Sequence, residues 1–232
     1  MRFLLVAFLW LIALGTVNVA SAETDAEGLS KRCQKGEAVA CLSLGYMYDE
    51  GTGVTQDSFK AVEFYRKACD GQFAAGCFNL GWMYDEGTGV RQDKFKAVEF
   101  YRKACDGQFA AGCFNLGNMY HNGTGVTQDD FKAVELYRKA CDGQQAKGCA
   151  NLGTMYNNGT GVTQDDFKAV ELYRKACDGK DGGGCWQLGW MYEQGNSVRQ
   201  SVADALTFYG KACDLKQKFG CEYYARLKTG KK

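Results

Sequence analysis

Residues 110–145 read AAGCFNLGNMYHNGTGVTQDDFKAVELYRKACDGQQ, and this 36-residue unit occurs five times in register along the chain. The five copies and a final half-copy begin at Ala38, Ala74, Ala110, Ala146, Gly182 and Lys218. A fixed period of roughly 20 to 50 residues is typical of arrays in which each copy packs only against its neighbours. The repeat therefore predicts a single elongated domain built from one stacked unit.

Each copy is predicted to form a helical hairpin, because apolar or small residues recur at spacings of three and four in both halves. In the quoted copy the first stripe is Cys113, Leu116, Gly117 and Tyr120, and the second is Ala133, Leu136, Tyr137 and Ala140. We call the two predicted helices of each copy helix A and helix B. The glycine-rich segment 122–125 separates them, Asp129 or Asp130 can cap helix B, and Gly143 ends it.

The amino terminus has the features of a secretory signal peptide. Arg2 is followed by a short apolar run, 3–14, and then by the small residues Ala20, Ser21 and Ala22. We expect cleavage after Ala22, with an uncleaved anchor as the alternative, and a secreted or periplasmic mature protein. The predicted organisation is a signal peptide at 1–22, an amino-terminal cap at 23–37, five repeats at 38–217 and a half-repeat cap at 218–232.

Charge gives no indication of a polyanionic partner. The full chain has 28 basic and 27 acidic residues, and removal of 1–22 takes away Arg2 and no acidic residue. A mature chain without net charge is not expected to bind nucleic acid or an anionic membrane surface. Membrane insertion of the mature chain is not expected either.

The twelve cysteines are spaced as C-x7-C, which in an exported chain favours disulfides. The predicted pairs are Cys33–Cys41, Cys69–Cys77, Cys105–Cys113, Cys141–Cys149, Cys177–Cys185 and Cys213–Cys221. An alternative scheme joins cysteines 28 positions apart within one hairpin, but it leaves Cys33 and Cys221 without partners. Zinc is a second alternative, but the sequence lacks C-x2-C spacing and has one histidine. We expect neither a metal nor a cofactor.

The repeated motifs A-x-G-C-x-N-L-G-x-M-Y, G-T-G-V and F-K-A-V-E-x-Y-R-K-A-C resemble Sel1-like repeats of the Helicobacter cysteine-rich protein type. These repeats are relatives of the tetratricopeptide repeat. The resemblance implies an all-α fold, a right-handed α/α solenoid of antiparallel helix pairs stapled by disulfides. It also implies that the chain binds proteins or peptides. Some exported members are classed as penicillin-binding proteins or β-lactamases, which makes β-lactam binding and hydrolysis the alternative function.

The sequence shows no catalytic motif for that alternative. None of the serines is followed by lysine at the third position, and G-x-S-x-G is absent. His121 occupies a position that holds aspartate, asparagine or glutamate in the other copies, so it is interpreted as surface variation. Paired cysteines cannot act as nucleophiles. Enzymatic activity is therefore uncertain and would rest on the resemblance alone.

A binding groove is predicted on the face of helix A that is not part of the apolar stripe. The sixth position of the repeat is polar in every full copy: Ser43, Asn79, Asn115, Asn151 and Gln187. The ninth position varies, and the second holds one cation. The predicted groove residues are Asn79, Trp82, Asn115, Asn118, Lys147, Asn151, Gln187 and Trp190. Their amides can bind a peptide backbone or a free carboxyl terminus.

Two other interpretations of this face remain open. The asparagines can instead bond the adjacent helix and organise the packing of the array. The protein can also be a passive envelope or host-facing structural protein, which would have no discrete ligand.

Overall fold

The computed structural model describes residues 25–230, so the predicted signal peptide lies outside the described residues. The described chain falls into two compact units, one ending at Gly107 and one beginning at Gln108. In the first unit, residues 25–34 are helical and are followed by four helices. These are α2 (Ala38–Glu50), α3 (Ser58–Asp70), α4 (Ala74–Glu86) and α5 (Lys94–Asp106).

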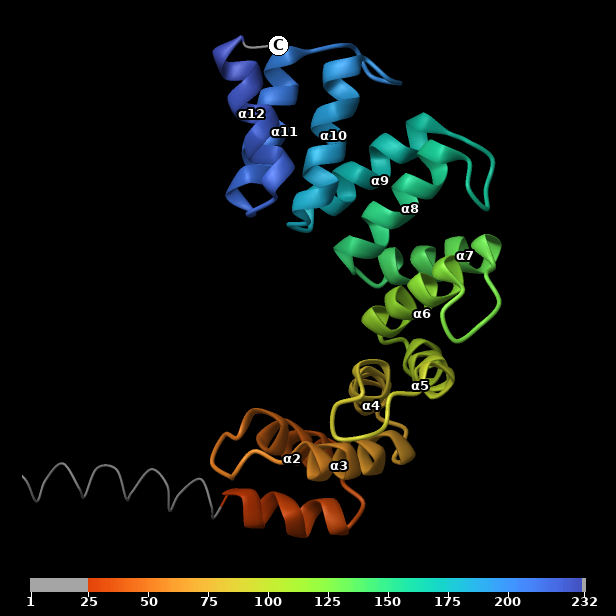
Figure 1. The fold of residues 1–232 in the computed structure, drawn as a ribbon, viewed down its shortest axis with the longest axis vertical. Helices are drawn as coiled ribbons and strands as arrows, with labels where there is room; N and C mark the ends of the chain where they lie inside the picture. The colour runs from red at the N-terminus through yellow and green to blue at the C-terminus, as the bar shows by residue number, and fades with distance from the viewer. Residues whose placement is uncertain (1–24, 231–232) are drawn as a thin grey trace, which may run out of the picture. The chain divides into compact units, whose positions relative to one another are not determined.

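The second unit contains seven helices, drawn from green to blue in Figure 1. They are α6 (Ala110–Asn122), α7 (Asp130–Asp142), α8 (Ala146–Asn158), α9 (Asp166–Asp178), α10 (Gly182–Gln194), α11 (Val202–Asp214) and α12 (Lys218–Thr229). Each even-numbered helix from α6 to α10 packs against the helix that follows it, and α12 packs against α11. Residues 25–230 contain no strand. The predicted all-α fold of helical hairpins is confirmed.

The helix boundaries follow from the turn residues. Helix α6 ends at Gly123, whose φ of 66° lies in the left-handed region that favours glycine. Asp129, the first of the two predicted candidates, caps α7 by accepting from the backbone N–H of Lys132, at 3.0 Å. Asp165 caps α9 in the same way. Asp130 instead contacts His121.

These caps lead to an expected pH dependence. The backbone N–H of Lys132 stabilises the Asp129 carboxylate and lowers its pKa, and Lys168 does the same for Asp165. A lowered folded pKa stabilises the protein above the unfolded value of about 3.9, and the stabilisation is lost as pH falls through the folded pKa. Asp165→Asn keeps a good capping side chain but cannot titrate. We expect its melting temperature to fall less than that of the wild type between about pH 5 and pH 2. If the melting temperatures of the variant and the wild type fall equally over this pH range, the capping carboxylate is not the source of the pH dependence.

A tyrosine from helix B fills the centre of each hairpin. Tyr137 and Tyr173 are each 1% exposed and Tyr209 is fully buried. The ring of Tyr173 lies against Gly153 of α8, where an added Cβ would be 2.8 Å from Cε1. Glycine in helix A therefore lets the two helices of a hairpin approach each other across an aromatic ring.

Disulfides join the helix at 25–34 to α2 and, within each unit, each helix B to the helix that follows it. The bonds are Cys33–Cys41, Cys69–Cys77, Cys141–Cys149, Cys177–Cys185 and Cys213–Cys221. Cys105 and Cys113 are disulfide-bonded as well, and residues 25–230 contain no free cysteine. The five bonds from Cys33–Cys41 to Cys213–Cys221 given above each have the eight-residue separation that the spacing predicts.

Candidate functional site

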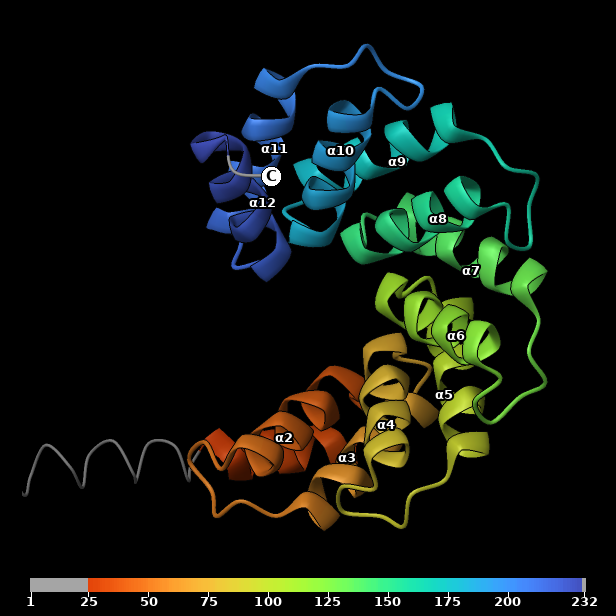
Figure 2. The same cartoon turned by 45° about the horizontal axis from the view of Figure 1, so that its top comes forward.

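The candidate site is the helix A face of the second unit, formed by α6, α8 and α10. Helices α8 and α10 contact each other, as do α10 and α12, and in Figure 2 these helices lie on the inner side of the unit. Asn118, Asn151 and Trp190 are all partly exposed on this face. The face is therefore accessible and is built from side chains of consecutive copies.

Asn118 and Asn151 are bonded to each other. The Nδ2 of Asn151 donates to Oδ1 of Asn118 at 3.1 Å, and the hydroxyl of Tyr137 donates to the same oxygen at 2.8 Å. Asn118 Nδ2 and Asn151 Oδ1 make no hydrogen bond within residues 25–230, and both side chains are partly exposed. The pair therefore presents one donor group and one acceptor, the combination that a peptide group requires.

Tyr173 forms a similar contact in the next hairpin. Its hydroxyl donates to Oγ1 of Thr154 at 3.3 Å and accepts from Nε2 of Gln187 at 3.5 Å. Gln187 therefore belongs to the packing of α9 as well as to the face of α10. This contact agrees with the alternative packing role, and the groove itself stays a prediction.

The buried tyrosine hydroxyls explain most of the variation at the ninth position of the repeat. Where the twelfth position is a carboxylate, the tyrosine donates to it, as in Tyr65–Asp49 at 3.2 Å and Tyr209–Glu193 at 2.8 Å. Where the twelfth position is His121 or Asn157, the acceptor is Asn118 or Thr154 at the ninth position. The ninth position is aromatic only in the carboxylate copies: Tyr46, Trp82 and Trp190.

The tyrosines remain donors at neutral pH. Burial is the main cause that raises the pKa of Tyr137 and Tyr173. Burial, followed by the negative charge of Asp49, raises the pKa of Tyr65, and burial with the hydrogen bond to Glu193 raises that of Tyr209. A protonated hydroxyl must find an acceptor when buried, so one acceptor on helix A is required in every hairpin.

The predicted groove residues fall in both units. Asn79 and Trp82 belong to the first unit, where Trp82 is 40% exposed but Asn79 only 9%, with its Nδ2 buried and without a hydrogen-bond partner. The others belong to the second unit. Lys147 is exposed on α8 and forms no ion pair within the described part of the chain.

His121 pairs with Asp130, and the acidic and basic residues of this pair exchange positions between copies. Its Nδ1 lies 2.6 Å from Oδ1 of Asp130, whereas in α4 and α5 the same two positions hold Asp85 and Lys94, also 2.6 Å apart. The sequence interpretation as surface variation missed this local contact. The complementary change at the two positions was the available signal.

Two of the serines form local structural hydrogen bonds. The hydroxyl of Ser43 donates to the carbonyl of Val39, and that of Ser201 caps α11. No cluster of histidine, cysteine and carboxylate residues within 25–230 could hold a metal ion. None of the helices in this part of the chain has the length and apolarity needed to cross a membrane.

One set of exposed aromatic residues was missed by the sequence analysis. The second residue of each of the first four B helices is a phenylalanine that is at least 70% exposed: Phe59, Phe95, Phe131 and Phe167. The positions were treated only as part of the repeated motif. Their place outside the helix B stripe is the signal that could have identified them.

Antiparallel helix pairs, repeated in register with a polar face on one helix of each pair, define a helical repeat protein of the α/α solenoid class. The family model described as Sel1 repeat matches residues 38–73, 74–109, 110–144, 146–181 and 183–216. The chain belongs to the Sel1 repeat family. The predicted resemblance is confirmed, and Sel1 repeats generally mediate protein interactions.

Solved structures support the family assignment. The chain is similar to c5321, a protective antigen present in uropathogenic Escherichia coli strains displaying an SLR fold, with 34% identity over 87% of this chain and a TM-score of 0.82. It spans 43% of the length of c5321. A Sel1 repeat protein from Oxalobacter formigenes is 29% identical over 78% of this chain and 74% of its own, with a TM-score of 0.73.

Helicobacter pylori cysteine rich protein B is 33% identical over 54% of this chain and 90% of its own, with a TM-score of 0.45. Among curated proteins, none matches this sequence.

Proposed function

We propose that this protein binds an extended peptide segment of a partner protein on the helix A face of the second unit. The observation that supports this most directly is the Asn118–Asn151 pair, whose remaining donor and acceptor point to a backbone amide as the ligand group. A peptide in extended conformation can also cross successive copies.

Lys147 and Trp190 supply the further contacts that the proposal needs. Lys147 is an exposed cation on the same helix as Asn151, and it is the only lysine at the second position of any copy. It suits a peptide that ends in a free carboxylate. Trp190 on α10 is partly exposed, and aromatic anchors often dominate the energetics of peptide binding.

Disulfides also indicate the compartment. Cysteine pairing throughout the described chain suggests an oxidising, extracytoplasmic environment. We place the protein in the periplasm or outside the cell, exported by the predicted signal peptide and cleaved after Ala22. Mass measurement of the amino terminus of the exported protein tests the cleavage, and an intact Met1 would contradict it.

The binding proposal is tested with a peptide selected from a random library on the oxidised protein. We expect Asn151→Ala to weaken binding about fivefold to tenfold, because one hydrogen bond to the ligand is lost. Asn157→Ala is the matched control, since Asn157 lies on the same helix and its side-chain amide donates to Asn158, at 3.3 Å.

Amidation of the peptide carboxyl terminus should weaken binding to the wild type and have no effect on binding to Lys147→Ala. If Asn151→Ala folds and binds the peptide with unchanged affinity in calorimetry, the groove proposal is wrong and the asparagines serve only in packing.

A further inference from the structure

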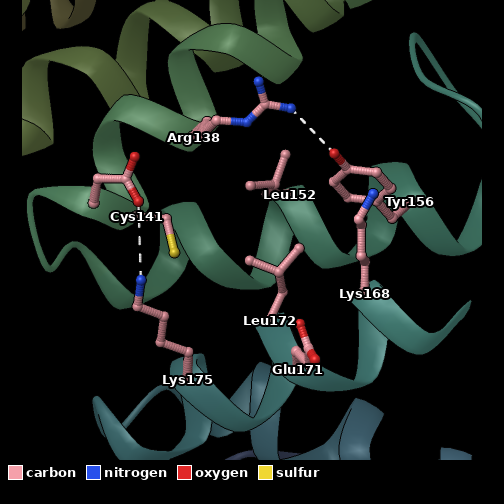
Figure 3. A pocket seen from close by; sticks show the side chains of 9 residues that line it. Arg138, Cys141, Leu152, Tyr156, Lys168, Glu171, Leu172 and Lys175 are labelled. Carbon is pink, nitrogen blue, oxygen red and sulfur yellow. Dashed lines mark hydrogen bonds and ion pairs between the residues drawn. The ribbon is translucent and has the colours of Figure 1, made fainter. Parts of the chain in front are cut away.

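A pocket of 290 Å³ lies between α7, α8 and α9, and it does not involve the predicted groove residues (Figure 3). Leu152 and Leu172 form its apolar part, and the ring of Tyr156 forms one wall. Leu172 packs against the Cys141–Cys149 disulfide. The charged residues around the opening are Arg138, Lys168 and Lys175 with Asp142 and Glu171.

Comparison between copies shows why the pocket exists. Helices α3, α5 and α11 hold a phenylalanine where α9 holds Leu172. Each phenylalanine stacks on the tyrosine of its own hairpin at 5.5 Å between ring centroids, in the pairs Phe64–Tyr48, Phe100–Tyr84 and Phe208–Tyr192. Tyr156 has no aromatic ring partner within the described residues. A branched four-carbon side chain thus stands where the fold accommodates a flat ring.

The absent ring also changes the position of Lys175. The corresponding Lys103 lies 5.0 Å from the centroid of Phe100 and pairs with Glu99 at 2.7 Å. Lys175 instead approaches Asp142, at 3.9 Å, and Glu171 forms no ion pair within residues 25–230 (Figure 3). The lysine and the glutamate have both lost the arrangement that a ring at this position organises.

Contacts with two cationic side chains fix the position of the Tyr156 ring. Arg138 donates to the Tyr156 hydroxyl at 3.1 Å, and Lys168 lies 5.3 Å from the centre of the same ring. A lysine in this place does not prevent stacking, because Tyr48 has Lys60 at 4.9 Å and stacks on Phe64 as well.

We propose that this pocket is a second binding site, which takes one aromatic side chain presented by an acidic peptide segment of a partner protein. The ring stacks on Tyr156, and the Lys175 ammonium moves over it as Lys103 lies over Phe100. A cavity of about 150 Å³ already holds benzene, so 290 Å³ admits a phenyl ring with its Cβ and adjoining backbone. Three cations against two carboxylates around the opening favour acidic residues beside the ring.

The chain supplies its own matched variants. Helices α3, α4 and α5 of the first unit carry the same residues as the pocket at eight of its nine positions, and the ninth is Phe100 in place of Leu172. Leu172→Phe should therefore close the pocket with the ring that the fold uses elsewhere. Phe100→Leu should open an equivalent pocket in the first unit.

The probe is an acetylated and amidated Glu-Phe-Glu tripeptide, titrated by calorimetry into the oxidised full chain. Relative to the wild type, we expect Leu172→Phe to remove one binding site, Phe100→Leu to add one, and the double variant to restore the original number. Leu136, the other leucine at this position of helix B, is unchanged in every variant. Replacement of the phenylalanine of the probe by leucine should weaken binding at least about tenfold.

Three results would overturn the proposal. The first is the absence of saturable binding to the wild type, and the second is equal affinity for the leucine probe. The third is an unchanged number of sites in Phe100→Leu, which decides the matter even if Leu172→Phe should fold poorly. Asn151→Ala leaves this pocket intact, so failure here is distinguishable from failure of the groove.

Discussion

Replacing Cys141 and Cys149 by alanine is expected to lower the free energy of unfolding of the oxidised protein by about 2.5 kcal/mol or more. The bond closes a loop of nine residues between α7 and α8, with a sequence separation of 8. Its removal lets the unfolded chain explore conformations that the bond forbids, and chain entropy alone accounts for that value in the loop model. The repeat architecture adds to the effect, because each copy is stabilised mainly by its neighbours.

Thermal melting followed by circular dichroism measures this effect, with and without a thiol reductant. Cys213→Ala with Cys221→Ala is the matched control, since that bond holds only the terminal helix α12. We expect a smaller loss of helix stability there, and a large fall in the wild-type melting temperature on full reduction. Equal melting of the oxidised wild type and the central double variant would show that the bond is structurally dispensable.

Gly153→Ala is expected to destabilise the protein by about 1 to 3 kcal/mol, although alanine is the better helix former. The added methyl carbon would lie 2.8 Å from Cε1 of Tyr173. That ring is buried and cannot move aside without opening the contact between α8 and α9. Steric overlap therefore outweighs the gain of about 1 kcal/mol in helix propensity.

Gly210→Ala is the control with the opposite expected sign. Gly210 is also a glycine inside a helix, α11, but an added Cβ would be 3.5 Å from its nearest neighbour, Tyr224, which is an ordinary contact. We expect this variant to be more stable than the wild type by about 0.5 to 1 kcal/mol. An increase in melting temperature for both variants would contradict the close approach at Gly153.

The fold was predictable because apolar residues recur at helical spacing in every copy. Five copies therefore give the same prediction of a helical hairpin. The Cys113, Leu116 and Gly117 stripe and the C-x7-C spacing both depend on local sequence. Local spacing determines which face of a helix is buried, and the structure agrees at these three positions. The division of the described chain at Gly107 could not be read from a repeat that continues unchanged across it.

The candidate site was less accessible to sequence reasoning, because its contacts depend on three positions far apart in the repeat. Asn118 was predicted as a groove residue because its position varies among copies. In the structure its side chain accepts the hydrogen bond that the buried hydroxyl of Tyr137 must donate. The pocket beside Tyr156 escaped notice for a related reason. Leu172 fits the apolar stripe as well as phenylalanine does, and only the packing shows which volume it leaves open.

The disulfides also define how the oxidised protein would extend under force. Between Cys149 and Cys177 the chain has no covalent shortcut, whereas Cys177 and Cys185 are tied directly. Pulling can therefore unravel a hairpin only between successive bonds, and each such segment of 28 residues releases about 90 to 100 Å of contour length. The repeats would therefore extend as a series of segments of equal length. The disulfides at its two ends limit the length that each unfolded hairpin can add.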